Sequence, residues 1–381
     1  MRLSLGIDLG TTNSVVATNA QVLSLLEGDI RAPLLPSAVA FLPDGGAVIG
    51  AAARERKPID PKNTVYASKR LMGETINSAA ARQFRLQYPH DIEACPAGGV
   101  QFMTRAGPVR PGEVAALIAS HLCMRAMFHP AKVSTVVTVP SAFRETARQA
   151  TVTSIRQAGF TDLRLLEEPV ATAVAYLHRA SLRYAAVYDL GGGTFDFAVI
   201  DCAQFPFRIL GHSGDPYLGG EDIDSALAEI VATEVLKSSS WDLKSDPITY
   251  ARLMLACEQA KCALALDETA TVDIAQLDPA APPSVASFVV TRDMLQSAAY
   301  PLIQRTFGIC DEVLSEAKIK ARDVQAVFMA GGSTRLFMLH SMVNNYFGRR
   351  LRVDLNPEHV VALGASMVAA RPELWPLLDP C

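Results

Sequence analysis

The sequence predicts an α/β protein whose two lobes repeat one strand pattern. An Asp-Leu-Gly-Thr-Thr segment at residues 8–12 and an Asp-Leu-Gly-Gly-Gly-Thr segment at 189–194 each stand between two short apolar runs, which is the pattern of strand, tight turn and strand. Helical and extended patterns alternate after each copy. At 381 residues the chain also exceeds the length at which one hydrophobic core usually stops growing, so two lobes are expected.

The first lobe starts with the predicted hairpin around residues 8–12. Residues 33–111 follow, and their Pro, Gly and short helical runs indicate an irregular insertion. Apolar periodicity then predicts a helix at 113–128, a strand at 133–139, a helix at 145–158, a strand at 163–166 and a helix at 170–179.

The second lobe restarts the pattern at residues 181–202, with strands at 186–188 and 195–200. Residues 219–283 are interpreted as an insertion similar to the first. The predicted closing elements are a helix at 293–317, a strand at 326–330 and helices at 336–347 and 359–370. Duplication is the economical explanation, and it predicts lobe I at 1–180, with a core of 1–35 and 113–180 around a subdomain at 36–112, and lobe II at 181–381, with a core of 181–220 and 291–381 around a subdomain at 221–290.

Composition excludes several classes of protein. Half of the residues are apolar and 19% are charged, which excludes a disordered chain. The net charge is −4 and no basic run occurs, so a nucleic-acid partner is not expected.

The N-terminus lacks the pattern of a signal peptide, and the apolar stretch at 114–128 is too short for a bilayer, so we expect a soluble, cytoplasmic protein without a membrane partner.

The seven cysteines are scattered and odd in number, which favours reduced, mostly buried thiols. Cys257 and Cys262 lie five residues apart on a predicted helix. This spacing is poor for zinc without nearby His or Cys, so core packing is the preferred interpretation of both.

The two glycine turns indicate a phosphate site. Glycine allows backbone N–H groups to surround an anion, and the Thr hydroxyls add donors. Asp8 and Asp189, at the two strand ends, supply carboxylate oxygens that suit Mg²⁺. One such turn alone reads as an ordinary hairpin, but two in matching contexts favour a shared polyphosphate. The sequence contains neither a P-loop motif nor a glycine motif that opens a helix, so these two other kinds of phosphate site are excluded.

Nine segments spread almost end to end carry a more specific resemblance: GIDLGTTNS (6–14), SKRLMG (68–73), VVTVPSAFRETARQAT (136–151), LLEEPVATAVAY (165–176), YDLGGGTFDFAVID (188–201), LGGEDID (218–224), ACEQAKCALA (256–265), AGGSTR (330–335) and LNPEHVVALGAS (355–366). With these segments the chain resembles the nucleotide-binding domain of the 70-kDa heat-shock (Hsp70) chaperones. The resemblance implies the actin-like ATPase fold, with duplicated ribonuclease H-like lobes and two inserted subdomains.

The resemblance also implies binding of ATP or ADP with Mg²⁺, K⁺ being left open as a further ion, and slow ATP hydrolysis. Asp8 and Asp189 would hold Mg²⁺ largely through water, and Lys69 would approach the γ-phosphate. The implied catalytic residues are Lys69, Glu168, Asp189, Thr194 and Asp196. The implied nucleotide-binding residues are Gly10, Thr11, Thr12, Asn13, Gly191, Gly192, Gly193, Thr194, Gly220, Glu258, Lys261, Gly331, Gly332, Ser333, Arg335 and Glu358.

Simpler interpretations stay open for some of these residues. Lys69 beside Arg70 reads by itself as a solvated helix face, and Glu168 before Pro169 as a helix N-terminus. The Gly331-Gly332 pair reads by itself as a strand-to-helix turn. Pro140 and Arg148 match the family pair that relays the nucleotide state outwards, although by themselves they read as a strand end and a surface charge.

The chain departs from the family at several positions. Cys262 and Ala265 stand where Arg and Ser usually face adenine, and Glu358 replaces an Asp, which implies weaker nucleotide binding. On the surface where the resemblance implies co-chaperone docking, Arg164 is kept, but Glu167 and Val170 replace the usual Asn and Thr. Stimulation by a J-domain partner therefore stays open, and so does the use of an exchange factor. Residues 374–379 resemble an interdomain linker or a packed terminus, and a client protein is expected only through another chain.

The resulting prediction is an ATP-hydrolysing conformational switch in protein folding. Two alternatives are a catalytically weak nucleotide-binding scaffold or regulator and an actin-like, filament-forming ATPase. The segments at 68–73 and 136–151 do not fit the filament branch, and no motif supports a sugar or acetate kinase.

Overall fold

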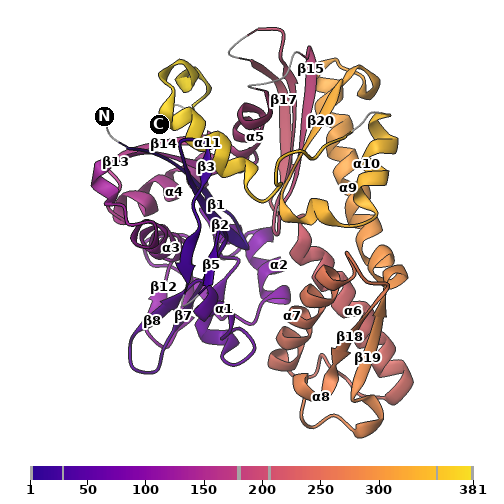
Figure 1. The fold of residues 1–381 in the computed structure, drawn as a ribbon. Helices are drawn as coiled ribbons and strands as arrows, with labels where there is room; N and C mark the ends of the chain where they lie inside the picture. Colours follow the sequence, from indigo (N-terminus) through magenta and orange to yellow (C-terminus); the bar gives the residue numbers. More distant parts are fainter. Residues whose placement is uncertain (1–2, 28–29, 178–181, 205–206, 349–350, 379–381) are drawn as a thin grey trace.

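The computed structural model describes residues 3–27, 30–177, 182–204, 207–348 and 351–378. Two lobes stand side by side, lobe I in indigo to magenta and lobe II in pink to orange (Figure 1). Each lobe has a central mixed sheet, and the two sheets have matching strand patterns. The predicted α/β fold class is confirmed, because each lobe combines a sheet of antiparallel and parallel strands with helices, and the two hairpins take equivalent places in the interior of the two sheets.

The sheet of lobe I has the strand order β14-β13-β1-β2-β3, and β6 pairs with β2 beside this path. Strand β1 is antiparallel to β2 and parallel to β13, which is in turn parallel to β14. Its strands are β1 (Leu3–Leu9), β2 (Asn13–Thr18), β3 (Gln21–Val22), β6 (Leu35–Pro36), β13 (Val133–Val139) and β14 (Asp162–Glu167).

The sheet of lobe II has the order β17-β16-β15-β20-β21. As in lobe I, a hairpin of antiparallel strands is followed by two parallel strands. Asp189 and Asp196 lie directly opposite each other in this hairpin. The strands are β15 (Tyr184–Leu190), β16 (Phe195–Asp201), β17 (Arg208–Asp215), β20 (Ala326–Ala330) and β21 (Leu351–Arg352).

Helices pack on both sheets, and α5 (Glu168–Leu177) contacts strands of both lobes. Helix α11, although late in the chain, packs on β1, β13 and α5 of lobe I. Glycine permits this close packing: a Cβ on Gly6 would lie 2.1 Å from the Ser366 nitrogen, and one on Gly364 would lie 1.7 Å from the Ala171 oxygen. The helices outside the insertions are α3 (Pro111–Arg125), α4 (Glu145–Gln157), α5 (Glu168–Leu177), α9 (Arg292–Ala317), α10 (Leu339–Phe347) and α11 (Val360–Ala370).

The stretch at 33–111 is not irregular, as the sequence had suggested. It forms two three-stranded sheets and short helices, but strands of three to five residues are too short to show periodicity. Its elements are β7 (Ala38–Phe41), β8 (Ala47–Ile49), α1 (Ala51–Arg54), η1 (Pro61–Asn63), β9 (Thr64–Tyr66), η2 (Ser68–Leu71), α2 (Ala79–Gln87), β10 (Ile92–Ala94), β11 (Val100–Thr104) and β12 (Gly107–Val109), and the pair β4 (Leu25–Glu27) and β5 (Ile30–Ala32) precedes them.

The insertion of lobe II is mainly helical. Two long helices pack against each other beside a two-stranded sheet. Its elements are α6 (Gly220–Ser239), α7 (Pro247–Ala263), β18 (Thr269–Asp273), α8 (Ile274–Leu277), η4 (Pro283–Val285) and β19 (Ser287–Thr291). The remaining short helices are η3 (Pro130–Lys132), η5 (Ala321–Asp323), η6 (Gly332–Arg335) and η7 (Pro372–Leu377).

Several predicted boundaries change for identifiable reasons. Helix α3 stops at Arg125 because Met127 adopts a left-handed backbone with φ 59°. The helix predicted at 336–347 begins at Leu339 because residues 332–335 form a 3₁₀ turn. Strand β17 was missed because its glycines and polar residues show no alternation. The end of the helix at 178–179 and the lobe boundary at 180 lie outside the described residues, and the lobe limits remain a prediction.

Candidate active site

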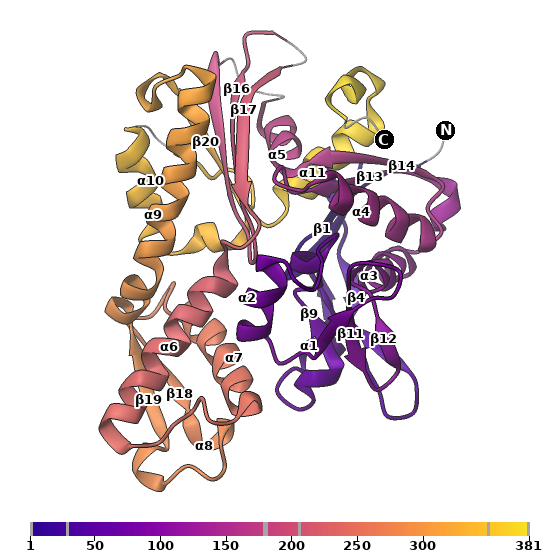
Figure 2. The same ribbon diagram turned by 180° about the vertical axis from the view of Figure 1, so that it is seen from behind.

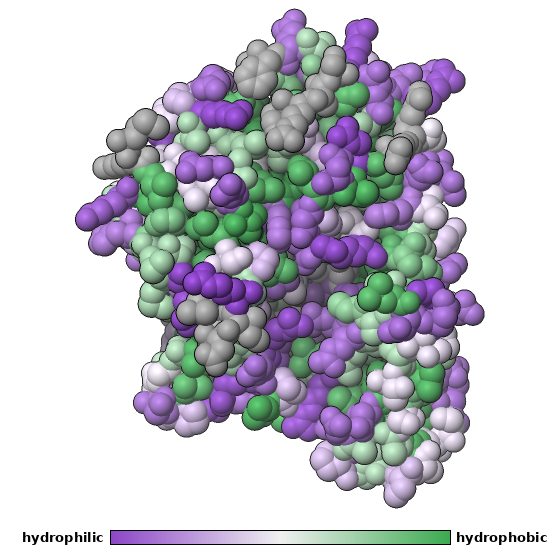
Figure 3. All heavy atoms as spheres, in the orientation of Figure 1, coloured by the Kyte–Doolittle hydropathy of each residue, from purple (hydrophilic) through white to green (hydrophobic). Residues whose placement is uncertain are grey.

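A cavity of about 530 Å³ lies between the two lobes. The space-filling view shows this face of the molecule hollowed along the line where the lobes meet (Figure 3). Eighteen of the predicted site residues line the cavity: Asp8, Gly10, Thr11, Thr12, Asn13, Lys69, Glu168, Asp189, Gly191, Gly192, Thr194, Glu258, Lys261, Gly331, Gly332, Ser333, Arg335 and Glu358. Asp196, Gly193 and Gly220 do not line it.

The tips of the two hairpins touch each other at the floor of the cavity. A Cβ on Gly192 would lie 1.9 Å from Thr12 Oγ1, and a Cβ on Gly193 would lie 2.5 Å from Thr11 Cγ2. Gly10 is required by its own turn, since a Cβ there would lie 2.1 Å from the Asn13 oxygen. The glycines of the second turn therefore allow close contact between the lobes.

An acidic cluster with one ammonium group lies beside these tips. Lys69, on η2, donates a hydrogen bond of 2.7 Å from Nζ to Glu168 Oε1 at the start of α5. Burial, and then Glu168, raise the pKa of Asp8 to about 7, although Lys69 and the Thr138 hydroxyl lower it in part. Burial, and then Glu168 and the other acids, also raise the pKa of Asp189.

The ammonium of Lys69 stays charged in this setting. Burial lowers its pKa, but Glu168 and then Asp8 outweigh burial and raise the pKa above its ordinary value. Buried carboxylates that raise one another's pKa favour a cation between them, and hard carboxylate oxygens suit Mg²⁺. In the part of the chain that the structure describes, no three His, Cys, Asp or Glu side chains converge as direct metal ligands. The donor set therefore fits an ion whose remaining ligands are water and phosphate oxygens.

Asp196 lies behind the cavity wall. Its Oδ1 accepts a hydrogen bond of 2.7 Å from the backbone N–H of Ser141, and the Ser141 hydroxyl also donates to it. Burial, and then Glu168, raise the pKa of Asp196 to about 7, against the lowering effect of Ser141. Asp196 thus links the second hairpin to the loop after β13 of lobe I.

Gly220 supports the second hairpin from below. Its N–H donates to the Gly191 oxygen at 3.0 Å, and Ser333 Oγ donates to the same oxygen at 2.7 Å. A Cβ on Gly220 would lie 2.4 Å from Ser333 Oγ. Close packing explains this glycine, as it does Gly193.

Lys261 is held on the lobe II wall by a residue that sequence reasoning missed. Its Nζ donates to Asp224 Oδ2 at 2.8 Å and to the Gly220 oxygen at 3.0 Å. Burial raises the pKa of Asp224 to about 7, although Lys261 lowers it in part. Asp224 and Glu221 line the cavity. Both belong to the segment at 218–224, where acidic residues follow a Gly-Gly pair, and this pattern is the signal by which the sequence could have identified them.

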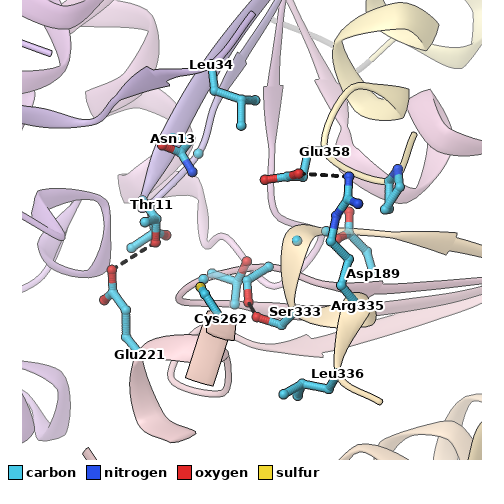
Figure 4. A pocket seen from close by; sticks show the side chains of 18 of the residues that line it. Thr11, Asn13, Leu34, Asp189, Glu221, Cys262, Ser333, Arg335, Leu336 and Glu358 are labelled. Carbon is cyan, nitrogen blue, oxygen red and sulfur yellow. Dashed lines mark hydrogen bonds and ion pairs between the residues drawn. The ribbon is translucent and has the colours of Figure 1, made fainter. Parts of the chain in front are cut away.

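The far end of the cavity carries an ion pair. Arg335 and Glu358 lie 3.0 Å apart, and Arg335 Nη2 also donates to Asn356 Oδ1 at 2.9 Å. Figure 4 shows this pair at one end and Glu221 beside the threonine turn. Sequence reasoning missed the apolar lining here, since its residues come from separate segments without a shared pattern: Val15, Leu34, Leu295, Leu336, Phe337, Pro357 and Val361.

Cys262 corrects one prediction. It is exposed and lines the cavity together with Ala265, whereas Cys257 on the same helix is buried in the core of lobe II. The core-packing interpretation is therefore wrong for Cys262 and correct for Cys257. At about 100° per residue, a separation of five residues leaves the two side chains about 140° apart around the helix axis, so the two thiols face different surroundings.

Arg148 and the linker-like segment also have defined places. Arg148 Nη2 donates to Glu167 Oε1 at 2.8 Å, and the other oxygen of Glu167 lies 3.3 Å from His212 Nδ1 on β17. In the described part of residues 374–379, Leu374 is 1% exposed within a hydrophobic core, and the Arg164 guanidinium lies 4.3 Å from the Trp375 ring centre. Residue 379 lies outside the described residues. The described part of this segment is therefore packed against the fold.

No helix of the described ranges is both long and apolar enough to cross a bilayer.

Comparison with known proteins agrees with this geometry. A "Chaperone protein HscA homolog" of Burkholderia mallei (strain SAVP1) is 39% identical over 373 residues, which cover 97% of this chain and 58% of that protein. A "Chaperone protein DnaK" of Stenotrophomonas maltophilia (strain R551-3) is 36% identical over 378 residues, with 95% and 58% covered. The chain thus spans a little over half the length of these relatives.

The family model described as Hsp70 protein matches residues 4–371. The paired sheets and two insertions agree with the actin-like ATPase fold that the sequence resemblance implied. Since the match includes both hairpins and every segment that lines the cavity, the chain belongs to the Hsp70 family.

Proposed function

We propose that this chain binds Mg·ATP in the cavity between its lobes and hydrolyses it slowly. One observation carries the proposal: the Lys69–Glu168 pair lies in a cavity that both glycine turns also line. Cation and carboxylate thereby face the place where two turns could hold a polyphosphate. The catalytic and binding residues predicted from sequence are proposed in these roles.

The proposed roles follow from the donors present. Backbone N–H groups of the turns, that of Thr12 included, and the hydroxyls of Thr11 and Thr194 would contact the phosphates, and the Lys69 ammonium would stabilise charge that develops on the γ-phosphate. Glu168 would orient the attacking water, because its carboxylate already lies 2.7 Å from the Lys69 ammonium. A Mg²⁺ ion held by Asp8 and Asp189, largely through water, would neutralise phosphate charge.

Hydrolysis would change the lobe angle in this proposal. Contacts from the γ-phosphate to both hairpins favour a closed form, and their loss on hydrolysis favours opening by hinge or shear motion. Small-angle scattering with ATP and with ADP measures this change. Identical profiles in the two states would reject the switch while leaving hydrolysis itself standing.

Single-turnover hydrolysis of Mg·ATP tests the enzymatic proposal. We expect Asp189→Asn to reduce the rate by about 10²-fold or more, since the proposed Mg²⁺ site loses one of its two carboxylates and with it part of the neutralisation of phosphate charge. The matched control is Asp44→Asn, an exposed carboxylate on a turn of lobe I. Equal rates in wild type and Asp189→Asn would contradict the proposed site.

A nucleotide-binding scaffold is the second candidate. The cavity carries a thiol at Cys262 and a methyl group at Ala265, and Arg335 is already paired with Glu358 and Asn356. A scaffold would bind ATP measurably by calorimetry without turnover that depends on Lys69. ATP-dependent sedimentation tests the filament alternative in the same preparation.

Partner proteins remain part of the proposal. We propose that a J-domain protein docks beside Arg164 and that a client protein binds through another chain. An exchange factor is a further partner to be tested. The Arg164 guanidinium already lies over the Trp375 ring, and Glu167 is paired with Arg148 and His212, so weak stimulation is expected. Single-turnover rates with and without a J-domain protein measure it, and a rise of tenfold or more would contradict this expectation.

A further inference from the structure

The first turn of α6 contacts lobe I through two acidic side chains. Both ribbon views place α2 of lobe I against α6 and α7 of lobe II (Figures 1 and 2). At this contact the Arg70 guanidinium donates two hydrogen bonds to Asp222, from Nη1 to Oδ1 at 3.0 Å and from Nη2 to Oδ2 at 2.7 Å. The Arg70 side chain is 1% exposed and that of Asp222 is 5% exposed. The two lobes are therefore joined by a buried, bidentate ion pair.

Glu221 makes a second link beside the first. It accepts a hydrogen bond of 2.9 Å from Thr12 Oγ1 on the first hairpin, and the Tyr88 hydroxyl of lobe I donates to its other oxygen. Arg70 Nε lies 3.6 Å from Glu221. Neighbouring residues of α6 thus bind the first phosphate turn and η2.

The same turn of α6 holds the second phosphate hairpin. Asp222 Oδ2 accepts from the Gly219 N–H at 2.8 Å, which caps the helix. The N–H groups of Gly220 and Glu221 donate to the oxygens of Gly191 and Gly192 at 3.0 and 2.7 Å. Asp222 and the backbone groups that hold the second turn thus belong to the same first turn of α6.

Lys69 and Arg70 are adjacent on η2, but their side chains bind partners in different lobes. Lys69 turns into the cavity towards Glu168, whereas Arg70 turns across the cleft to Asp222. The Tyr217 hydroxyl of lobe II also donates to the Arg70 carbonyl oxygen at 2.7 Å. Four residues of 3₁₀ helix thus connect the ammonium of the candidate site with the lobe that carries the second turn.

We propose that Arg70 is a positioning residue, which through Asp222 sets Lys69 against the second phosphate turn when the cleft closes. The inference rests on the proposed ATPase function. Opening the cleft separates two buried charges that were paired: within its own lobe Arg70 keeps the neutral Gln87 oxygen at 3.3 Å, and Asp222 keeps the Gly219 N–H at 2.8 Å, so neither retains a charged partner of that geometry. Closure and alignment of Lys69 are then one event, and Arg70 contributes to the rate without contacting the nucleotide.

Two measurements on Arg70→Met, Asp222→Asn and the double variant test this inference. In hydrogen exchange followed by mass spectrometry, we expect faster exchange at 68–73 and 216–224 in all three. In single-turnover hydrolysis, we expect a loss of at least tenfold in each single variant, with no further loss in the double variant because the two residues act as a pair. Asn keeps the helix-capping oxygen, and Arg70→Lys keeps the charge with fewer donors, so it should fall between wild type and Arg70→Met.

The control is Arg82→Met, an exposed arginine on α2 that should change neither readout. Exchange at both segments equal to that of wild type, in variants with an unchanged melting temperature, would overturn the inference. If the wild-type chain does not hydrolyse ATP, the proposed function fails, whereas the exchange measurement still decides whether the pair joins the lobes. Independent, additive losses in the double variant would also contradict it.

Discussion

Gly192 and Thr12 belong to different lobes, yet a Cβ on Gly192 would lie 1.9 Å from the Thr12 hydroxyl oxygen. Since no real Cβ contact is that short, the two hairpin tips touch only because residue 192 lacks a side chain. The Thr12 hydroxyl also donates to Glu221 at 2.9 Å. A methyl group at position 192 would therefore disturb one phosphate turn and one link between the lobes.

Gly192→Ala should weaken binding of ATP and lower single-turnover hydrolysis by at least tenfold, because the tips must separate. Calorimetry and single-turnover kinetics measure the two effects. Gly308→Ala, in helix α9, is the matched control, since a Cβ there meets nothing within 4 Å. An affinity and a rate equal to those of wild type in Gly192→Ala would show that tip contact is irrelevant to the site.

Lys69→Ala should lower the single-turnover rate by about 10²–10³-fold, the usual effect of removing one preorganised electrostatic group. ATP binding should change less, because the turns and the far end of the cavity remain. Lys62→Ala, an exposed lysine paired with Asp91, is the control. A rate that does not depend on Lys69 would favour the scaffold alternative.

His90 should make folding stability fall in acid. It lies among the rings of Tyr66, Phe84, Tyr88 and Phe102, and burial, followed by the charge of Lys57, lowers its pKa from 6.5 to about 3. Below pH 6.5 the unfolded chain takes up a proton that the folded chain refuses. The free energy of unfolding should therefore decrease by about 1.4 kcal/mol per pH unit from this residue as pH falls from 6.5 towards 3.

Urea unfolding of His90→Leu between pH 6.5 and 5 checks that slope. The variant should lose the contribution of this proton, whereas His129→Leu, at an exposed position, should retain it. The same pH dependence in His90→Leu and wild type would mean that His90 takes up its proton equally in both states.

Leu374→Ala should lower the free energy of unfolding by about 2–5 kcal/mol, because Leu374 is buried in the core that contains α5 and α11. Trp375→Leu, its partly exposed neighbour, should cost about 1 kcal/mol or less, mainly the contact with Arg164. Urea unfolding measures both. Equal, small losses would show that the segment does not pack in solution.

Much of the site could be predicted because it lies in turns with local signatures. The Asp-Leu-Gly segments identified both hairpins, and the order of Gly331 and Gly332 after them identified the far wall. Cys262 was placed in the core because helix position alone does not say which face meets a cavity. Asp224 was missed because its role depends on Lys261, which lies 37 residues away.

The sequence by itself determined the strand–turn–strand pairs, the alternation of helices and strands and the acids at the strand ends, because periodicity and turn chemistry act between neighbouring residues. Only the tertiary structure decided that α11 packs on lobe I, that glycines bring the two hairpin tips into contact, and that Arg70 meets Asp222. The last two residues are 152 positions apart, and nothing in local sequence specifies such a pair. Packing of the lobes excludes water from these charges, and that exclusion selects their partners.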